Sequence, residues 1–418
     1  MKKTLLSIAG VLFTVVATAQ NVSLSFAELC AKKNIELKPI AKSNKSIDAS
    51  KVFTVNVADT KKTNRAEGTD VYPYGEWVYV DIENENNHVV NQGFTMEQIE
   101  EVDEEGNTYN VGFKSFGGYV FTPIANYDEE AGTLTIPQGQ VVWDNPDAYG
   151  ACAIYGFDGE EGEEFYCDLV FEKDENGNFF MTNKGYQVLI VNEESEYYNY
   201  CLVEGTEVAF YQPNGTCTFQ APTKTDYQEV TSNVYIEDYG EEMSVYGMFS
   251  YAGDASVTSI RIEDNKAYID SDQQVDSEDQ SEYIKKNYNL EGDFGYLRFV
   301  VWLEKVGEEY YISTDDSDVN NFAYGYSAYL PGDIVDNTIT FHGYFTFATD
   351  YVDGAGALNY GNFKGLKLEM FKDNTEGISE VKTNVASSTK TFNLMGQQVN
   401  RANVKGIVIR DGKKLMMK

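Results

Sequence analysis

The chain has 418 residues, with 67 acidic against 32 basic side chains and a formal net charge of −35. This charge argues against nucleic acids and anionic lipid surfaces as partners, because both require clustered Lys and Arg. The only two histidines, His88 and His342, exclude histidine-rich zinc sites and most Ser-His or Cys-His catalytic machinery. An apolar fraction of 42% suffices for buried cores, and the length predicts two or three domains.

The charge is concentrated in the middle of the chain. Residues 1–65 carry a net charge of +7, residues 66–375 a net charge of −47 and residues 376–418 a net charge of +5. Segments that differ this much in charge have different roles. We therefore expect an acidic folded body between two basic ends.

The N-terminus has the features of a secretory signal peptide over residues 1–19. A charged start precedes a short apolar segment, and Ala17 and Ala19 form a small-x-small cleavage site. An N-terminal membrane anchor is the alternative interpretation, but the apolar segment is short for a bilayer span, and no later run reaches the length of one. The sequence predicts export, no transmembrane segment, and a basic linker over residues 20–65.

The body has the pattern of antiparallel strands. Apolar and polar residues alternate over residues 339–347 and 366–370, which indicates half-buried strands. The unbroken apolar run 299–303 predicts a strand buried on both faces, and residues 95–102 allow one short helix. Abundant Tyr and Gly are also found in outer-membrane barrels, but the unbroken run favours a buried strand over one between lipid and lumen.

Weak internal similarity indicates that the body is duplicated. Residues 136–141 align with residues 269–275, and residues 172–181 align with residues 304–312. The alternative is that strand-turn-strand units resemble one another by composition. We predict an all-β fold of two tandem antiparallel β-sandwich or jelly-roll-like modules, residues 66–222 and 223–375, followed by a small β tail over residues 376–418.

Two groups of aromatic residues are candidates for binding. Tyr72, Tyr74 and Trp77 lie together near the start of the body, and Tyr324 and Tyr326 lie near its end. Sugars stack on aromatic rings, and tyrosine anchors many protein interfaces. The alternative is that Tyr suits the outward or edge face of a strand, which accounts for most of the 31 tyrosines.

Four cysteines, Cys152, Cys167, Cys201 and Cys217, lie in the first module. Their spacing does not match Cys-x-x-Cys, which disfavours a metal site. An exported protein meets an oxidising environment that permits disulfides, but buried thiols fit the sequence equally well. Both outcomes stay open, as does any pairing.

Acidic residues are dense after residue 269, where Asp270, Asp272, Asp276 and Asp279 follow one another. Calcium takes six to eight oxygen ligands, and carboxylates this close repel one another unless a cation lies among them. These four aspartates are the calcium candidates, with a solvated acidic loop as the alternative. The sequence predicts no other cofactor.

The C-terminal segment carries the most specific motif. It has Asn393 and Gly396 within Phe-Asn-Leu-Met-Gly-Gln-Gln-Val, then Lys405-Gly406 before three aliphatic residues, and Gly412-Lys413 near its end. This pattern resembles the C-terminal sorting domain of Bacteroidota secreted proteins, the type IX (Por) secretion signal. The resemblance covers about a tenth of the chain and implies export across the outer membrane, with the secretion machinery as a partner.

A non-enzymatic binding or adhesion role at the cell surface, with a glycan or a protein as ligand, is the function that these features favour. A structural stalk without a ligand site is the second interpretation, and a secreted glycoside hydrolase with an unrecognised carboxylate pair is the third. The nearest match to a Glu-x-Asp-x-x-Glu hydrolase motif, at residues 79–83, lacks its first acid. We therefore expect no catalytic residues.

Overall fold

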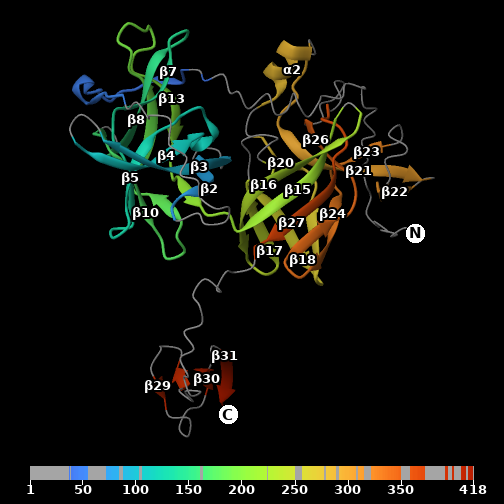
Figure 1. The fold of residues 1–418 in the computed structure, drawn as a ribbon. Helices are drawn as coiled ribbons and strands as arrows, with labels where there is room; N and C mark the ends of the chain where they lie inside the picture. Colours follow the sequence, from blue (N-terminus) through green and yellow to red (C-terminus); the bar gives the residue numbers. More distant parts are fainter. Residues whose placement is uncertain are drawn as a thin grey trace. The chain divides into compact units, whose positions relative to one another are not determined.

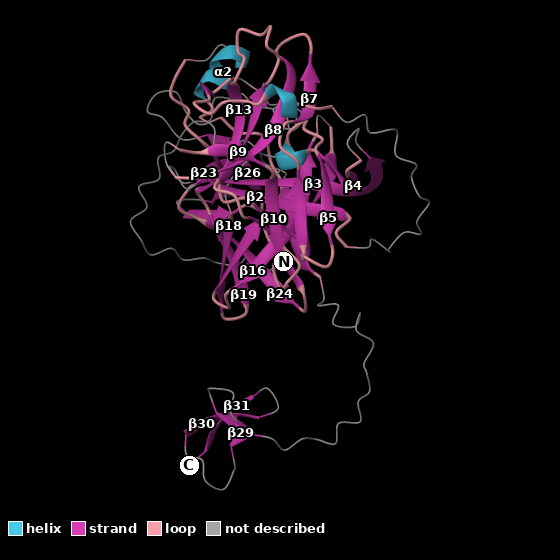
Figure 2. Cartoon of the chain, turned by 90° about the vertical axis from the view of Figure 1, so that its left-hand side faces the viewer, coloured by secondary structure: helices cyan, strands magenta, loops and turns pink. Residues whose placement is uncertain are grey.

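The three-dimensional structure is a computed structural model, and strands make up nearly all of its regular secondary structure (Figures 1 and 2). Two compact units are present, Met1–Phe371 and Lys372–Lys418. The structure describes residues 37, 39–54, 72–83, 88–102, 106–160, 163–223, 225–249, 257–276, 279–288, 291–306, 309–314, 322–349, 358–371, 391–393, 398–399, 406–410 and 413–417.

The first module is built on a closed barrel of antiparallel strands. Each strand is hydrogen bonded to the next, and the last strand pairs with the first. In order around the barrel, the strands are β2 (Gly75–Glu83), β3 (His88–Val102), β4 (Thr108–Lys114), β5 (Ile124–Asp128), β6 (Thr133–Ile136), β10 (Leu169–Lys173), β11 (Phe179–Met181) and β14 (Ala209–Tyr211).

A separate sheet of the same module, the first accessory sheet, shares the core of this barrel. Its strand order is β1-β13-β12-β8-β7, and β9 also pairs with β8. Ile154 and Val188 on its inner face belong to the same apolar core as Phe171 and Phe210 of the barrel. The elements are β1 (Ala41–Lys42), β7 (Gln140–Asn145), β8 (Gly150–Asp158), β9 (Phe165–Cys167), β12 (Gly185–Ile190) and β13 (Tyr200–Gly205), with 3-10 turns at η1 (Ala49–Lys51) and η2 (Phe116–Gly118).

The second module has a second closed barrel and a second accessory sheet. In order around the barrel, the strands are β15 (Gly215–Pro222), β16 (Tyr227–Asp238), β17 (Glu242–Tyr246), β18 (Thr258–Glu263), β19 (Lys266–Asp270), β24 (Tyr329–Val335), β25 (Thr338–Phe341) and β27 (Lys364–Met370). The accessory sheet contains β20 (Gln273–Gln274), β21 (Leu297–Val306), β22 (Glu309–Ile312), β23 (Phe322–Gly325) and β26 (Phe345–Thr349), and α2 (Ser281–Tyr288) lies between β20 and β21 in the chain.

The two modules follow the same path through their sheets. After β1, which the first module adds at its start, each module has five consecutive barrel strands, enters the accessory sheet, returns to the barrel for two strands, revisits the accessory sheet and ends with one barrel strand. The central accessory strands correspond as well, because β8 pairs with β7, β9 and β12, while β21 pairs with β20, β22 and β26. The chain therefore contains two tandem barrel modules of one topology.

The alignment that indicated a duplication agrees with this topology only in its first part. Residues 136–141 and 269–275 both lead from the fifth barrel strand into the accessory sheet. Residues 172–181 and 304–312 both form hairpins, but the first hairpin belongs to a barrel and the second to an accessory sheet. Short strand-turn-strand units resemble one another in composition, which explains the second match.

The all-β, antiparallel class is confirmed, but the strands close into barrels rather than forming the sandwiches or jelly rolls that we predicted. A sandwich leaves strand edges at the sides of its sheets, whereas every strand of these barrels has two neighbours. The alternation of apolar and polar residues is the same in both architectures, because it reports only which face of a strand is buried. The sequence pattern therefore does not determine closure.

Residues 95–102 belong to β3 rather than to the short helix that we predicted. The register between β3 and β4 shifts between Gln98 and Glu101. Met96 and Ile99 are both buried although they are three residues apart, because Met96 packs in the large core of the first module and Ile99 packs in a separate small cluster with Tyr109 and Ile124. A three-residue spacing of buried side chains is also helical, which explains the wrong prediction.

The apolar run 299–303 lies in β21 and is buried on both faces, as predicted. Phe299 and Val301 belong to the large core of the second module. Val300 and Trp302 belong to a smaller cluster on the opposite face. β21 is thus the central strand of its sheet.

The C-terminal unit contains a sheet with the strand order β29-β28-β30-β31. Asn393, Gly406 and Lys413 of the predicted sorting tail lie in β28 (Thr391–Asn393), β30 (Gly406–Arg410) and β31 (Lys413–Met417), and β29 is Gln398–Val399. The other predicted tail residues and the predicted cleavage site lie outside the described residues: Gly396, Lys405, Gly412, Ala17 and Ala19.

Candidate binding site

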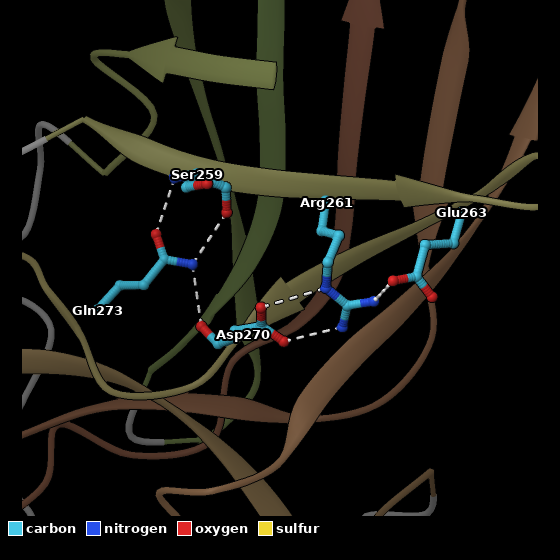
Figure 3. A network of polar contacts seen from close by, with 5 residues as sticks. All are labelled: Ser259, Arg261, Glu263, Asp270 and Gln273. Atoms are coloured by element: carbon cyan, nitrogen blue, oxygen red, sulfur yellow. Dashed lines mark hydrogen bonds and ion pairs between the residues drawn. The ribbon is translucent and has the colours of Figure 1, made fainter. Parts of the chain in front are cut away.

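Two of the four aspartates considered for calcium pair with arginines. Asp270, at the end of β19, accepts hydrogen bonds from Arg261 Nη2 at 3.1 Å and Nε at 3.4 Å (Figure 3). Asp272 has its Oδ1 3.5 Å from Arg298 Nε, and its carbonyl oxygen accepts a hydrogen bond from Arg298 Nη1 at 3.1 Å. These guanidinium groups supply positive charge next to the two carboxylates.

The other two aspartates precede α2 in the chain. Asp276 is 5% exposed, and its Oδ2 accepts a hydrogen bond from Gln280 Nε2 at 2.9 Å. Asp279 Oδ1 accepts a hydrogen bond from the backbone N–H of Ser281 at 2.8 Å, as a helix-capping residue does. Among the residues that the structure describes, no three His, Cys, Asp or Glu side chains gather as a metal site requires. Each of the four aspartates instead has a protein partner of its own.

Arg261 is the centre of an exposed polar network on β18 and β19 (Figure 3). Its Nη1 lies 2.6 Å from Glu263 Oε1, and the hydrogen bonds that the guanidinium donates to Asp270 and Glu263 raise its pKa. Gln273 Oε1 accepts a hydrogen bond from the Ser259 N–H at 2.8 Å, and Gln273 Nε2 donates to the Asp270 carbonyl oxygen at 3.0 Å. The network is exposed, so its ion pairs contribute about 1 kcal/mol or less each.

The first predicted aromatic group lies mainly in the core of the first barrel. Trp77 is 2% exposed and donates its Nε1–H to the carbonyl oxygen of Pro73 at 2.8 Å. The ring centroid of Tyr72 lies 6.0 Å from that of Trp77 and 5.8 Å from that of Phe179, and Tyr74 packs against the same core. Trp77 is thus buried, whereas Tyr72 and Tyr74 are half-buried.

The second predicted aromatic group packs on the outer face of the second accessory sheet. Tyr324 is 6% exposed and stacks on Trp302, with ring centroids 4.7 Å apart, and its hydroxyl accepts a hydrogen bond from Asn359 Nδ2 at 2.8 Å. Tyr326 donates its hydroxyl to the carbonyl oxygen of Thr349 at 2.8 Å. Tyr324 is thus buried in a small cluster on this face, and the half-buried Tyr326 packs against the same cluster.

Aromatic residues that the sequence analysis did not select meet between the two barrels. Tyr211 of β14 stacks on Tyr235 of β16, with ring centroids 4.2 Å apart and planes inclined by 12°. The Tyr246 ring of β17 lies 5.7 Å and 5.9 Å from these two rings, and Phe180 of β11 lies 5.8 Å from Tyr211. Together with Tyr239, which follows β16, we call Phe180, Tyr211, Tyr235 and Tyr246 the junction cluster.

One carboxylate, that of Glu237, connects two hydroxyls of the junction cluster. Its Oε2 accepts hydrogen bonds from Tyr239 at 2.7 Å and from Tyr246 at 3.1 Å. Tyr239 is 67% exposed and Phe180 is 39% exposed, while the other three rings are half-buried. The cluster therefore offers aromatic surface and hydrogen-bonding groups to solvent at one place.

Strand alternation places the junction cluster on the outer faces of the barrels. In β16, Val234 and Ile236 are buried in the barrel, so Tyr235 between them points outward. In β14, Phe210 is fully buried, so Tyr211 points outward as well. The stack thus joins the outside of one barrel to the outside of the next.

Polar contacts hold the two halves of the junction cluster together. Only residues 212–214 separate β14 from β15. Asn214 Oδ1 accepts a hydrogen bond from the Ile236 N–H at 2.7 Å, and Asn214 Nδ2 donates to the Ile236 carbonyl oxygen at 2.8 Å. Asn233 of β16 donates to the carboxylate of Glu76 in β2. We expect this short connection, held by the hydrogen bonds of Asn214, to limit movement of β14 relative to β16.

The phenols of the junction cluster stay protonated at physiological pH. Burial raises the pKa of Tyr211 to about 12 and also raises the pKa values of Tyr235 and Tyr246. The hydrogen bond to Glu237 is the main cause of the raised pKa of Tyr239. All four hydroxyls can therefore act as hydrogen-bond donors.

Sequence analysis missed this cluster because its residues come from four strands of two modules. The available signal is that Tyr235 and Glu237 occupy outward positions in a strand whose buried positions are apolar. Such a pattern identifies the exposed face of one strand but not the strand that lies against it. The contact between Tyr211 and Tyr235 depends on how the barrels pack.

The four described cysteines are free thiols. Cys152, Cys201 and Cys217 are buried, and Cys167 is half-buried, with its Sγ accepting a hydrogen bond from Asn183 Nδ2 at 3.2 Å. Burial raises the pKa of Cys152 and of Cys201 to about 12 and raises that of Cys167 as well. Thiols react as thiolates, so these groups react slowly in the folded protein.

We expect Cys167 to be alkylated well before Cys152 and Cys217 in the native protein. The two buried thiols become accessible only when the structure opens, so their labelling should be slower by about 100-fold or more. Peptide mapping after timed exposure to a maleimide measures the three rates separately. Equal rates would show that the cores around Cys152 and Cys217 open as readily as the surface near Cys167.

No protein-family model matches the chain, no curated protein matches it in sequence, and no solved structure matches it. Among the helices that the structure describes, none is both long enough and apolar enough to cross a bilayer. The junction cluster combines two exposed aromatic rings, those of Phe180 and Tyr239, with the carboxylate of Glu237.

Proposed function

We propose that the protein is exported and binds a neutral carbohydrate chain, without catalysis, through the junction cluster. A single observation carries this proposal: five aromatic side chains from two barrels, grouped around one carboxylate, are left partly exposed. Phe180 and Tyr239 are exposed, whereas Trp77 and Tyr324 of the other two aromatic groups are buried and Tyr72, Tyr74 and Tyr326 are half-buried. Aromatic faces stack on the apolar face of a sugar, and carboxylates and phenols bond to its hydroxyls.

The charge of the body selects the class of glycan. Residues 66–375 carry a net charge of −47, and Glu237 and Asp174 lie close enough to raise the pKa of Tyr211. A sialylated or sulfated chain would be repelled by this field. An uncharged polysaccharide meets no such barrier, so we propose a neutral glycan.

The ends of the chain support an extracellular location in this proposal. The signal-like residues 1–19 and the sorting-like residues 376–418 are both addresses for export. Through the tail, the secretion machinery is the second proposed partner. The protein then acts at the cell surface or in the medium, where polysaccharides are available.

A structural role is the alternative that one observation favours. Tyr211 and Tyr235 cover one face of each other's ring, and the contacts of Asn214 and Asn233 lie beside them. The same aromatic residues can therefore serve only to fix one barrel on the next. In that case the protein is a stalk, and Tyr239 contributes nothing to binding.

A glycan array tests the proposal, with the purified protein and two variants. The wild-type protein should bind neutral glycans, and Tyr239→Ala should lose that signal. Tyr311→Ala is the matched control, because Tyr311 also donates its hydroxyl to a glutamate two residues earlier, Glu309, but lies in β22 outside the cluster. Retention by the control with loss in Tyr239→Ala supports the proposal; no binding by any of the three, or binding only to acidic glycans, contradicts it.

A further inference from the structure

Residues 37–53 form a strap across the outer face of the first accessory sheet. At one edge of the sheet, Ala41 is paired with Cys201 of β13, and the Ile40 N–H donates to the Cys201 carbonyl oxygen at 2.8 Å. At the opposite edge, Phe53 forms a parallel bridge with Gln140 of β7. Since β12 and β8 lie between those two strands, the strap crosses the whole sheet. Residues that we predicted as linker are thus packed against the first module.

The face beneath the strap is apolar and fully covered. Ala153, Tyr155, Leu189 and Cys201 are each 3% exposed or less, and Ile47 of the strap packs against them. An uncovered patch of this kind on a sheet invites association with another chain. The face therefore requires a cover in the folded protein.

Leu37, at the start of the strap, is buried in the core of the first module, and its carbonyl oxygen accepts a hydrogen bond from the Tyr149 hydroxyl at 3.0 Å. Beyond this anchor, every described residue from 39 to 53 is exposed or half-buried. Asn199 Nδ2 donates to the carbonyl oxygens of Ser43 and Lys45 at 3.1 Å, and the Ser43 hydroxyl lies 2.6 Å from that of Tyr166. A segment with so little buried area opens at lower free energy than the sheet below it.

One buried group is left unsatisfied in the covered state. The Tyr155 hydroxyl is in a residue that is 1% exposed, and it has no hydrogen-bond partner. A buried hydroxyl without a hydrogen bond destabilises the covered state by about 1–3 kcal/mol, because it has lost its hydrogen bonds to water. Water can form these hydrogen bonds again when the strap moves away from the sheet. The covered state thus carries a penalty that favours opening.

The same segment of another copy fits this face as well as the chain's own segment does. The contacts described above for residues 37 and 39–53 are with the first module, and residues 54–74 that follow the strap reach roughly 70 Å when extended. The strap carries four lysines and one aspartate, so it is the part of one copy that the acidic body of another attracts. We propose that the first accessory sheet accepts residues 37–53 of a second copy, and that copies associate by exchanging this strap.

The test uses the pairing of Ala41 with Cys201, because direct cross-strand partners are close enough for a disulfide. In the full-length Ala41→Cys protein, mild oxidation should link positions 41 and 201 within one chain. A donor that combines Ala41→Cys with Cys201→Ser is then mixed with the wild-type protein as acceptor. In that mixture a 41–201 bond can form only between two chains, and mass spectrometry of the cross-linked peptides identifies it.

We expect the mixture to yield about tenfold more linked dimer than a control donor does. The control donor combines Thr340→Cys with Cys201→Ser, because Thr340 is exposed on β25 in the other module and lies far from the strap in sequence. Strap exchange is overturned if Ala41→Cys links within its own chain while the mixture gives no more dimer linked through the acceptor's Cys201 than the control donor gives. Failure of the intrachain link would overturn the strap register itself, and with it the proposal.

Discussion

Replacing Gly205 by alanine should lower the free energy of unfolding by about 3 kcal/mol or more, because the new methyl group has no room. Gly205 of β13 is paired with Tyr186 of β12, whose ring lies against the glycine. A Cβ at position 205 would overlap that ring and come within 2.7 Å of Asp81 Oδ2. Chemical denaturation followed by far-UV circular dichroism measures the loss.

The network next to Gly205 explains why the loss is large. Tyr186 shares a 2.8 Å hydrogen bond with the hydroxyl of Tyr79, and Asp81 Oδ1 accepts a hydrogen bond from the Thr206 N–H at 3.0 Å. All three side chains are buried, so displacing one of them leaves polar groups unsatisfied. This network joins the barrel strand β2 to the accessory sheet.

Gly93→Ala is the matched control for this substitution. Gly93 is an exposed strand residue of β3, and a Cβ there would have nothing within 4 Å. We expect its stability to change by less than about 0.5 kcal/mol. If both substitutions lower the free energy of unfolding by less than about 0.5 kcal/mol, then Tyr186 does not lie over Gly205. The contact between the first barrel and its accessory sheet would then be contradicted.

Raising the pH above 10 should unfold the protein cooperatively. Burial raises the pKa of Tyr324 to about 12 and holds the pKa values of Tyr79 and Tyr186 well above 10. Below pH 10 these phenols are neutral in both states and stability is unaffected. Above pH 10 they ionise in the unfolded chain but not in the folded one, so the stability that they contribute is lost by about 4 kcal/mol per pH unit.

Tyrosinate absorbance and circular dichroism, recorded together against pH, measure this effect. The buried tyrosines should ionise in the same narrow pH range in which the fold is lost. Tyr324→Phe removes one of the three groups and should reduce the pH dependence by about 1.4 kcal/mol per pH unit. A gradual ionisation of all tyrosines around pH 10, with the fold retained, would contradict the buried positions of these rings.

The all-β class could be predicted from the sequence because its strand patterns correspond to strands in the structure. The run 299–303 is buried on both faces of β21, and all five of its side chains are apolar, without the alternating polar residues of a half-buried strand. Closure of the barrels was not predictable, because it depends on pairings such as β14 with β2, which are far apart in sequence. Burial on both faces of β3, at Met96 and at Ile99, likewise imitated helical spacing.

The predicted binding and calcium residues have contacts within the protein that the amino-acid sequence around them does not reveal. Trp77 and Tyr324 are aromatic residues that fill cores, and nothing in their local sequence distinguishes them from exposed ones. Asp270 was considered for calcium, but Arg261, which neutralises it, comes from the neighbouring strand. The junction cluster depends on contact between two modules, which no single segment encodes.

The most direct measurement is a calorimetric titration of a neutral oligosaccharide, chosen from the array, into three proteins. The wild-type protein and Tyr311→Ala should bind it with the same Kd. Tyr239→Ala should bind it about tenfold more weakly or not at all, since one exposed ring of the junction cluster is lost. An unchanged Kd in Tyr239→Ala, or the absence of heat with every neutral oligosaccharide, would contradict the account of the junction cluster as a carbohydrate-binding site.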